Sequence, residues 1–161
     1  MFMRYFMILV IAEKPSLGRD IADALPGQRG GGDGRRYIEK GDYVVTWVFG
    51  HMLTLKEPED YDKRYKKWSL DDLPIYFDDW GMKVGSDSGG GFESKSQRVK
   101  LIGELLERSD SAIHAGDPDE EGQLLVDELL EWFKYDRPVM GLDTGDTARG
   151  GLTKAVGKMK D

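Results

Sequence analysis

Blocks of apolar and polar positions alternate along the chain and predict strands and helices in turn. Residues 7–12 form an unbroken apolar run with β-branched side chains, which is typical of a central strand covered on both faces of a sheet. Apolar positions recur at helical spacing across residues 17–25, with Ser16 as the expected N-cap and Pro26-Gly27 as the stop. We therefore expect a strand, a loop and a helix in this order, as in an α/β domain.

The middle of the chain predicts a hairpin followed by a long insertion. Residues 28–35 are rich in glycine but lack the Gly-Lys-Ser/Thr ending of a phosphate-binding loop, so we interpret them as a turn. Residues 37–39 and 43–49 are expected to pair as a hairpin. Residues 56–92, dense in Tyr, Trp, Lys, Asp, Pro and Gly, are expected to form a loop-rich insertion.

The second half of the chain continues the alternation of helices and strands. The predicted elements are a helix opened by Ser94 or Ser96 and ending at Arg108, a strand at 112–115, an acidic turn at 116–122, a helix at 123–133, a strand at 138–142 and a helix at 153–160. The pattern predicts an α/β fold, with a small parallel sheet and helices on both of its faces. We assign residues 1–161 to a single domain.

Composition narrows the chemistry. The 161 residues carry a net charge of −7, which argues against a domain that holds nucleic acid by charge alone. The absence of cysteine excludes disulfide frameworks, zinc–thiolate sites and cysteine nucleophiles. The only histidines are His51 and His114, for which we favour structural roles, so any metal should be a hard cation held by carboxylates.

The apolar N-terminus superficially resembles a signal peptide. The run is interrupted by Arg4, stops at residues 13–15, and has no small-residue cleavage site. It is also too short to span a bilayer. We therefore interpret it as a buried strand and expect a cytoplasmic protein with no membrane partner.

The acidic turn at residues 117–122 is the sharpest chemical feature of the sequence. It lies where a predicted strand ends and a helix begins, which is where sites form in parallel sheets. Asp117 and Asp119 can point to the same side of the turn, and clustered carboxylates with open water positions suit Mg²⁺ and hence phosphoryl chemistry. Glu13 and Lys14 follow the first predicted strand, so they would face this turn if the two strands are neighbours.

Two other interpretations of the acidic turn stay open at this point. Asp117, Asp119, Gly122 and Glu128 fall at positions one, three, six and twelve of an EF-hand calcium loop, but Glu121 is atypical at position five and the preceding segment is predicted as a strand. Alternatively, the acidic residues merely occupy the first turn of a helix, where the helix dipole favours anions.

Several blocks of the sequence, taken together, resemble the Toprim domain of type IA DNA topoisomerases, and the bacterial topoisomerase III subgroup most. The similarity runs from about Met7 to Asp136. The blocks, which occur in the same order and at similar spacing, are residues 8–16, 37–47, 49–51, 65–70, 73–74 and 115–125.

The resemblance implies a mechanism in which a tyrosine attacks a DNA phosphodiester, another strand passes, and the break is resealed. By resemblance, Glu13 is a catalytic acidic residue that binds metal and shuttles a proton to the leaving 3′-oxygen. Lys14 stabilises charge on the transferring phosphoryl group. Asp117 and Asp119 hold Mg²⁺ and Glu121 completes that site. DNA is the implied partner, contacted mainly through domains outside this chain, and no small-molecule substrate is implied.

The sequence also departs from the family pattern. Glu120 stands where the family usually has arginine, and none of the seven tyrosines lies in the context of the family's nucleophile. We therefore expect an N-terminal domain that does not relax supercoils alone. The alternatives are a free-standing Toprim nuclease or primase-like protein, and a non-enzymatic calcium-binding module.

Overall fold

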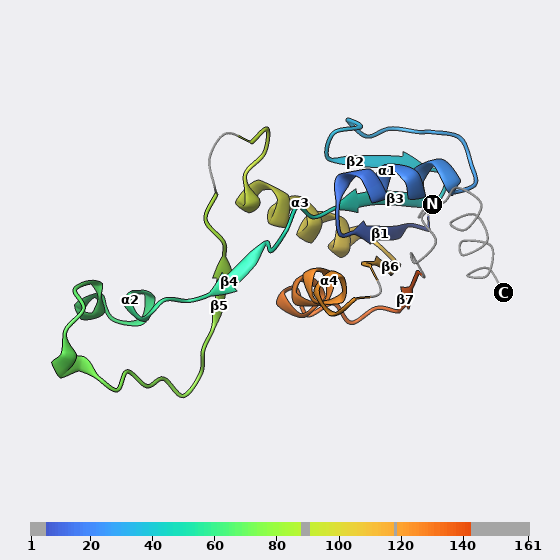
Figure 1. Ribbon diagram of the computed structural model, residues 1–161. Helices are drawn as coiled ribbons and strands as arrows, with labels where there is room; N and C mark the ends of the chain where they lie inside the picture. Colours follow the sequence, from blue (N-terminus) through green and yellow to red (C-terminus); the bar gives the residue numbers. More distant parts are fainter. Residues whose placement is uncertain (1–5, 88–90, 118, 143–161) are drawn as a thin grey trace.

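A five-stranded sheet forms the centre of the protein. The computed structural model describes residues 6–87, 91–117 and 119–142 (Figure 1). The strands lie in the order β2 (Tyr37–Lys40), β3 (Tyr43–Trp47), β1 (Ile8–Ala12), β6 (Ser111–Ala115) and β7 (Val139–Gly141). All neighbours are parallel except the edge strand β2, which pairs antiparallel with β3 as the predicted hairpin. The predicted α/β fold with a mainly parallel sheet is confirmed.

Helices cover both faces of the sheet, as expected. Helix α1 (Pro15–Ala24) packs on one face, where Leu17 and Ile21 meet Val10 and Trp47. Helices α3 (Lys95–Arg108) and α4 (Glu120–Trp132) cover the other face (Figure 1). Strand β1 lies between these two layers, which explains why its sequence is apolar without alternation.

The starts of two helices test the predicted caps. Of the two serines expected to open α3, Ser94 is the cap: its Oγ accepts a hydrogen bond from the Gln97 backbone N–H at 3.1 Å, and the Gln97 side chain accepts from the Ser94 N–H at 2.9 Å. The predicted Ser16 cap of α1 is wrong, because the helix begins at Pro15 and Lys14 occupies the cap position without a side-chain hydrogen bond. Proline suits the first helical position, since its fixed φ angle is helical and it lacks an N–H that would need a partner.

Helix α4 begins three residues earlier than predicted. Asp119 is its N-cap and Glu120 its first residue, so Gly122 lies inside the helix instead of in the turn before it. The buried face of the helix also differs from the prediction: Leu124, expected among its apolar positions, is exposed, whereas Val126 is buried.

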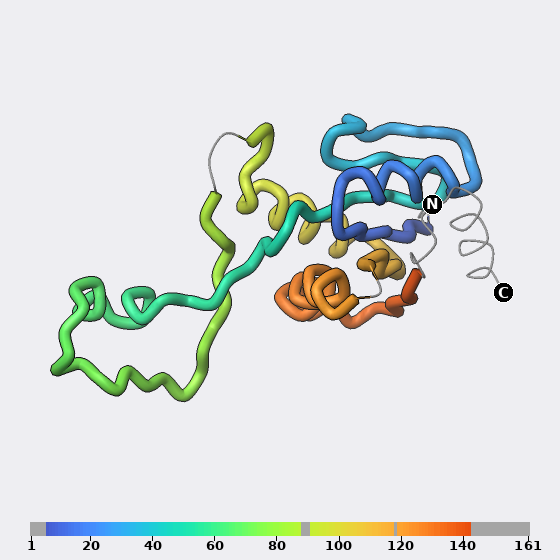
Figure 2. The backbone as a smooth tube through the Cα atoms, in the orientation of Figure 1, coloured from blue at the N-terminus to red at the C-terminus, as the bar shows by residue number. Residues whose placement is uncertain are grey.

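The insertion forms an arm that leaves the sheet. Strands β4 (Leu53–Leu55) and β5 (Met82–Val84) pair antiparallel and form its base. Beyond them lie helix α2 (Pro58–Tyr61) and the 3₁₀ helices η1 (Lys63–Lys66) and η2 (Leu70–Asp72), far from the central sheet (Figure 2). The arm has its own small aromatic cluster, since the rings of Tyr61 and Phe77 stack at 4.1 Å and Trp80 packs edge-on against both.

The described residues do not test two further expectations. The helix expected at 153–160 lies outside them, and the assignment of 1–161 to one domain stays a prediction. Within residues 6–87, 91–117 and 119–142, no helix has the length and apolar character needed to cross a bilayer.

Replacing Gly18 by alanine should destabilise the fold. A Cβ at Gly18 would lie 2.6 Å from Cε3 of Trp47, a residue that is only 1% exposed, so the buried indole ring would have to shift. We expect a loss of about 1–3 kcal/mol in the free energy of unfolding, because overpacking outweighs the better helix propensity of alanine. Urea denaturation measures this, and Ser16→Ala in the same helix is the control. If Ser16→Ala lowered the free energy of unfolding by more than about 0.5 kcal/mol, Ser16 would have to be considered again as the cap of α1.

Candidate metal and phosphate site

Two parallel strands bring the candidate residues together. Strands β1 and β6 are neighbours, and their last residues, Ala12 and Ala115, are paired in register. The residues that follow each strand therefore meet at the carboxyl edge of the sheet, where α/β proteins place their sites. The expected approach of Glu13 and Asp117 is observed, since the Asp117 backbone N–H donates to Glu13 Oε2 at 3.1 Å.

The Lys14 ammonium lies between two carboxylates. Its Nζ is 2.6 Å from Glu13 Oε1 and 3.0 Å from Asp117 Oδ2. Hydrogen bonds first to Glu13 and then to Asp117 raise the pKa of Lys14 above its usual range, and partial burial opposes them. The lysine side chain is 48% exposed and that of Glu13 is 12% exposed, so the cluster lies at the surface with Glu13 on its inner side. Two carboxylates are thus held together by an internal cation.

The β6–α4 turn depends on the close approach of two glycines. A Cβ on Gly116 would lie 2.2 Å from the Gly122 carbonyl oxygen. A Cβ on Gly122 would lie 2.5 Å from Glu13 Oε2 and 2.7 Å from the Asp117 nitrogen. The sequence pattern gives Gly122 a role only as position six of the calcium-loop alternative and gives Gly116 none, although both lie in the acidic turn. They allow the first turn of α4 to pack directly against Glu13 and Asp117.

Asp119 and Glu121 lie apart from this contact. Asp119 Oδ1 accepts a hydrogen bond from the Gly122 backbone N–H at 2.6 Å, so the carboxylate caps α4. Glu121 is exposed on the first helical turn. Among the residues that the structure describes, no three His, Cys, Asp or Glu side chains form a ready metal-binding group. The structure therefore joins Glu13, Lys14 and Asp117, while Asp119 and Glu121 remain nearby in sequence without joining them.

Comparison with known proteins agrees with the observed fold. Residues 8–145 match the family described as the Toprim domain, which is most of the chain. The chain belongs to the Toprim family. Its relatives include DNA topoisomerase 3 of Vibrio cholerae, 47% identical over 126 residues, and of Salmonella typhimurium, 46% identical over 129 residues. The Bacillus cereus DNA topoisomerase 3 is 37% identical over 136 residues.

These matches cover most of this chain and little of each relative. They span 78%, 80% and 83% of the chain, but only 18%, 18% and 17% of the relatives. The chain thus spans less than a fifth of the length of these DNA topoisomerase 3 proteins.

The two histidines of this Toprim domain differ from each other. His114 is buried, and its Nδ1 accepts from the Gly116 N–H at 3.2 Å while Nε2 lies 3.1 Å from the Gln123 carbonyl oxygen. It therefore ties both ends of the β6–α4 turn together, in agreement with the structural role favoured for it. His51 is instead exposed, with Nδ1 3.5 Å from Glu128 Oε2, so it is not packed in the core.

The calcium-loop interpretation is wrong for this Toprim domain. The segment before the acidic turn is strand β6, whereas an EF-hand requires a helix there. Residues that would form the second half of the loop lie in helix α4. The helix-dipole interpretation holds for Glu120 and Glu121, which occupy the first turn of α4.

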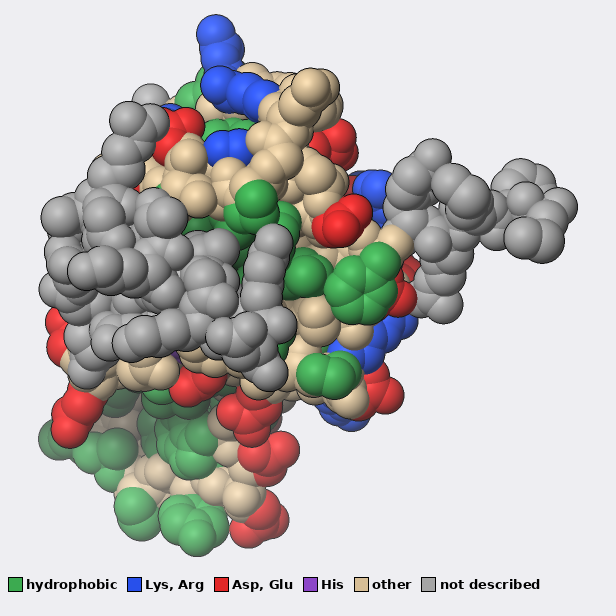
Figure 3. Space-filling view, turned by 90° about the vertical axis from the view of Figure 1, so that its right-hand side faces the viewer, with side chains coloured by type: hydrophobic (Ala, Val, Ile, Leu, Met, Phe, Trp, Pro, Cys, Tyr) green, Lys and Arg blue, Asp and Glu red, His purple; other side chains and the backbone are tan. Residues whose placement is uncertain are grey.

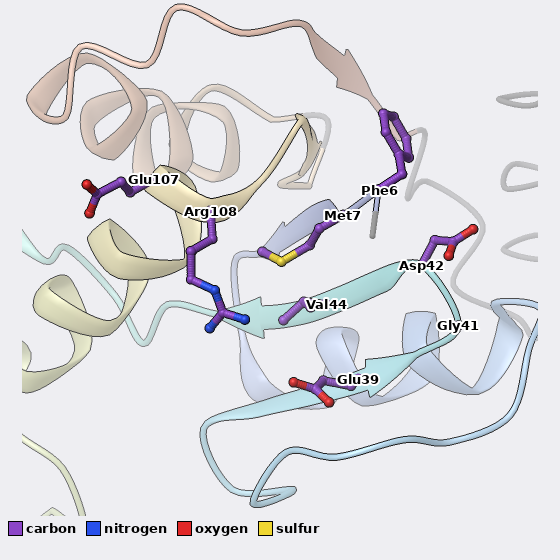
Figure 4. Close-up of a pocket in the computed structure, with 8 residues that line it drawn as sticks. All are labelled: Phe6, Met7, Glu39, Gly41, Asp42, Val44, Glu107 and Arg108. Carbon is purple, nitrogen blue, oxygen red and sulfur yellow. The ribbon is translucent and has the colours of Figure 1, made fainter. Parts of the chain in front are cut away.

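A cavity at the opposite edge of the sheet is less suited to binding a phosphate group than the site around Lys14. It has a volume of about 490 Å³ and lies at the amino ends of β1 and β3. Arg108 and three acidic side chains, Glu39, Asp42 and Glu107, line it (Figure 4). On the face of the protein drawn in Figure 3, acidic side chains are spread from top to bottom, whereas basic side chains lie at the top and on the right. The acidic excess of this cavity would repel a phosphodiester.

Replacing Gly122 by alanine should open the candidate site. The new Cβ must push Glu13 and the Asp117 backbone away from α4, because both would lie closer than real Cβ contacts allow. We expect the free energy of unfolding to fall by about 1–3 kcal/mol in urea denaturation. Gly141→Ala is the matched control, since a Cβ there meets nothing within 4 Å. Equal stability of the two variants would contradict the close packing described for Gly122.

Proposed function

We propose that this chain supplies the metal-binding and phosphate-binding part of the active site of a type IA DNA topoisomerase. One observation carries the proposal: Lys14 is held between Glu13 and Asp117 at the ends of two paired strands. The relatives named DNA topoisomerase 3 support it. Because those relatives are much longer, we propose the complete strand-passage reaction for a cytoplasmic protein in which this domain is joined to others.

The carboxylates fit Mg²⁺. They offer hard oxygen donors, and the Lys14 ammonium between Glu13 and Asp117 indicates that this pair favours a cation. In the proposal, Glu13, Asp117 and Asp119 hold the ion and Glu121 completes the site. When bound, the ion would offset negative charge on a DNA phosphodiester. Asp119 has one oxygen outside its capping contact with which to take part.

The protein residues then have distinct tasks in cleavage. A tyrosine hydroxyl from another part of the enzyme attacks the phosphorus, the bond to the 3′-oxygen breaks, and a 5′-phosphotyrosyl link forms. The tyrosine hydroxyl loses its proton as it attacks. The Glu13 carboxylate takes up this proton and passes it to the leaving 3′-oxygen, and the transfer runs in the opposite direction when the break is resealed. Lys14, released from the carboxylates, donates hydrogen bonds to the phosphoryl oxygens. The bond to tyrosine is itself a phosphodiester and retains the free energy of the broken bond, so resealing needs no separate energy source.

Glu120 modifies this picture. It is exposed beside the proposed site, at a position where the family usually has a cation. A negative charge at this position would lower the affinity of the proposed site for a DNA phosphate, so phosphate binding would depend more on Lys14.

Calorimetric titration with Mg²⁺ tests the proposed metal site. Asp117→Asn and Glu13→Gln should each weaken binding tenfold or more, because each removes a charged oxygen donor. Lys14→Met should instead strengthen Mg²⁺ binding, since the competing ammonium is gone. Asp20→Asn, an exposed carboxylate on α1, is the control and should leave the affinity unchanged. Equal affinities in all four variants would place the metal elsewhere.

Plasmid assays separate the topoisomerase from the nuclease alternative. With Mg²⁺ and supercoiled plasmid, this chain alone should neither relax nor nick the DNA, since the nucleophilic tyrosine lies outside it. Robust relaxation would refute the assignment of the nucleophile to another domain. Mg²⁺-dependent nicking that disappears in Asp117→Asn would favour a free-standing nuclease. Reading the gene beyond residue 161 for the tyrosine-bearing segment is the complementary observation.

A further inference from the structure

A second cavity lies beside the candidate site and combines arginines with aromatic rings. Its volume is about 230 Å³, and it reaches Pro15, the residue that follows Lys14. Three arginines and three aromatic side chains line it: Arg19, Arg35, Arg98, Trp47, Phe49 and Phe92. This composition differs from that of the protein as a whole, whose net charge is −7.

The floor of the cavity is a buried ion pair. Arg98 Nη2 lies 2.5 Å from Glu93 Oε2, and the two side chains are 3% and 6% exposed. Arg98 also donates to the Arg36 carbonyl oxygen at 2.7 Å and to Thr46 Oγ1 at 3.2 Å. Even so, Arg98 Nε and Glu93 Oε1 are buried without a hydrogen-bond partner among the described residues. Buried polar atoms without partners are rare in folded proteins, and a bound water, ion or ligand is one of the ways in which such atoms are satisfied.

The rim of the cavity offers cationic groups that are not engaged elsewhere. The guanidinium of Arg19 lies 5.2 Å from the ring centroid of Trp47, and that of Arg35 lies 5.2 Å from the centroid of Phe92. Both arginines are exposed, and within the described part of the chain neither side chain makes a hydrogen bond or ion pair. A guanidinium stacked on a ring keeps its N–H donors free at the edges of its plane, where they can bind phosphate.

We propose that this arginine–aromatic cavity binds one nucleotide of single-stranded DNA, with its phosphate on Arg19 and Arg35 and its base against Phe92 and Phe49. The proposal rests on the proposed function and adds to it a subsite next to Lys14. It also explains how an acidic domain holds a polyanion, because the positive charge is local.

The chemistry favours an unpaired nucleotide over other anions. Inorganic phosphate would use the arginines but not the aromatic rings, and an acidic peptide would not require flat apolar surfaces. A DNA duplex shows proteins only the edges of its bases, whereas unpaired bases stack on aromatic side chains. Phe92 is 70% exposed, so a ring face is available for stacking.

Fluorescence anisotropy with a short fluorescein-labelled oligothymidylate tests the subsite, at low salt and with EDTA to remove the contribution of metal. Arg19→Ala and Arg35→Ala should each weaken binding about fivefold, and Phe92→Ala about tenfold. Arg64→Ala, which removes the same charge from η1 in the arm, should change the affinity less than twofold. All of these side chains are exposed, and thermal melting confirms that each variant is folded.

The outcomes distinguish this subsite from the proposed metal site. Asp117→Asn should bind oligothymidylate in EDTA at least as tightly as the wild-type chain, because it removes a negative charge beside Lys14, while it loses Mg²⁺ binding; either site can therefore fail alone. The subsite is refuted if Arg19→Ala/Arg35→Ala binds the oligonucleotide as tightly as Arg64→Ala, or if the wild-type chain does not bind it. Unchanged oligonucleotide binding in Phe92→Ala, or equally tight binding of a DNA duplex, would refute the role of base stacking. The cavity would then be a simple anion site or a surface that binds a protein segment.

Discussion

The parallel pairing of β1 with β6 is the constraint on which the site depends. Residues 13 and 117 are far apart in sequence, and only the register of Ala12 with Ala115 places them at the same edge of the sheet. A shift of one residue along the strand would turn each β1 side chain to the opposite face, where it would no longer match its helix layer. Because β1 is buried on both faces, the hydrophobic core fixes this register, and the position of the charged residues follows from it.

Features encoded in a short stretch of sequence could be predicted. The strand predicted at 7–12 and the cap predicted at Ser94 or Ser96 each depend on a few neighbouring residues. The structure confirms the strand as Ile8–Ala12 and selects Ser94 as the cap. The meeting of Glu13 with Asp117 needed one further assumption, that the two strands are neighbours. That assumption was reasonable because apolar runs without alternation belong in the middle of parallel sheets.

Features that depend on tertiary contacts could not be predicted in the same way. The start of α4 is set by Asp119 as N-cap, together with the packing of Gly116 against Gly122, and neither is visible in apolar periodicity. The buried pair of Arg98 with Glu93 was also missed. A signal existed, since Arg98 shares a helical stripe with the buried residues of α3, but charged residues are so rarely buried that the pattern alone predicts exposure.

In the proposed mechanism, the position of Lys14 couples the binding of a metal ion to the binding of a phosphate. While the ammonium lies between Glu13 and Asp117, it neutralises them and is itself unavailable to other anions. A divalent ion that takes its place adds two positive charges and also releases the lysine. The total charge of the cluster rises by the two charges of the ion, and the ammonium that was paired with the carboxylates becomes available to an anion. Since coupling free energies are reciprocal, a DNA phosphate that attracts Lys14 outward should raise the affinity for the ion by the factor by which the ion raises the affinity for phosphate.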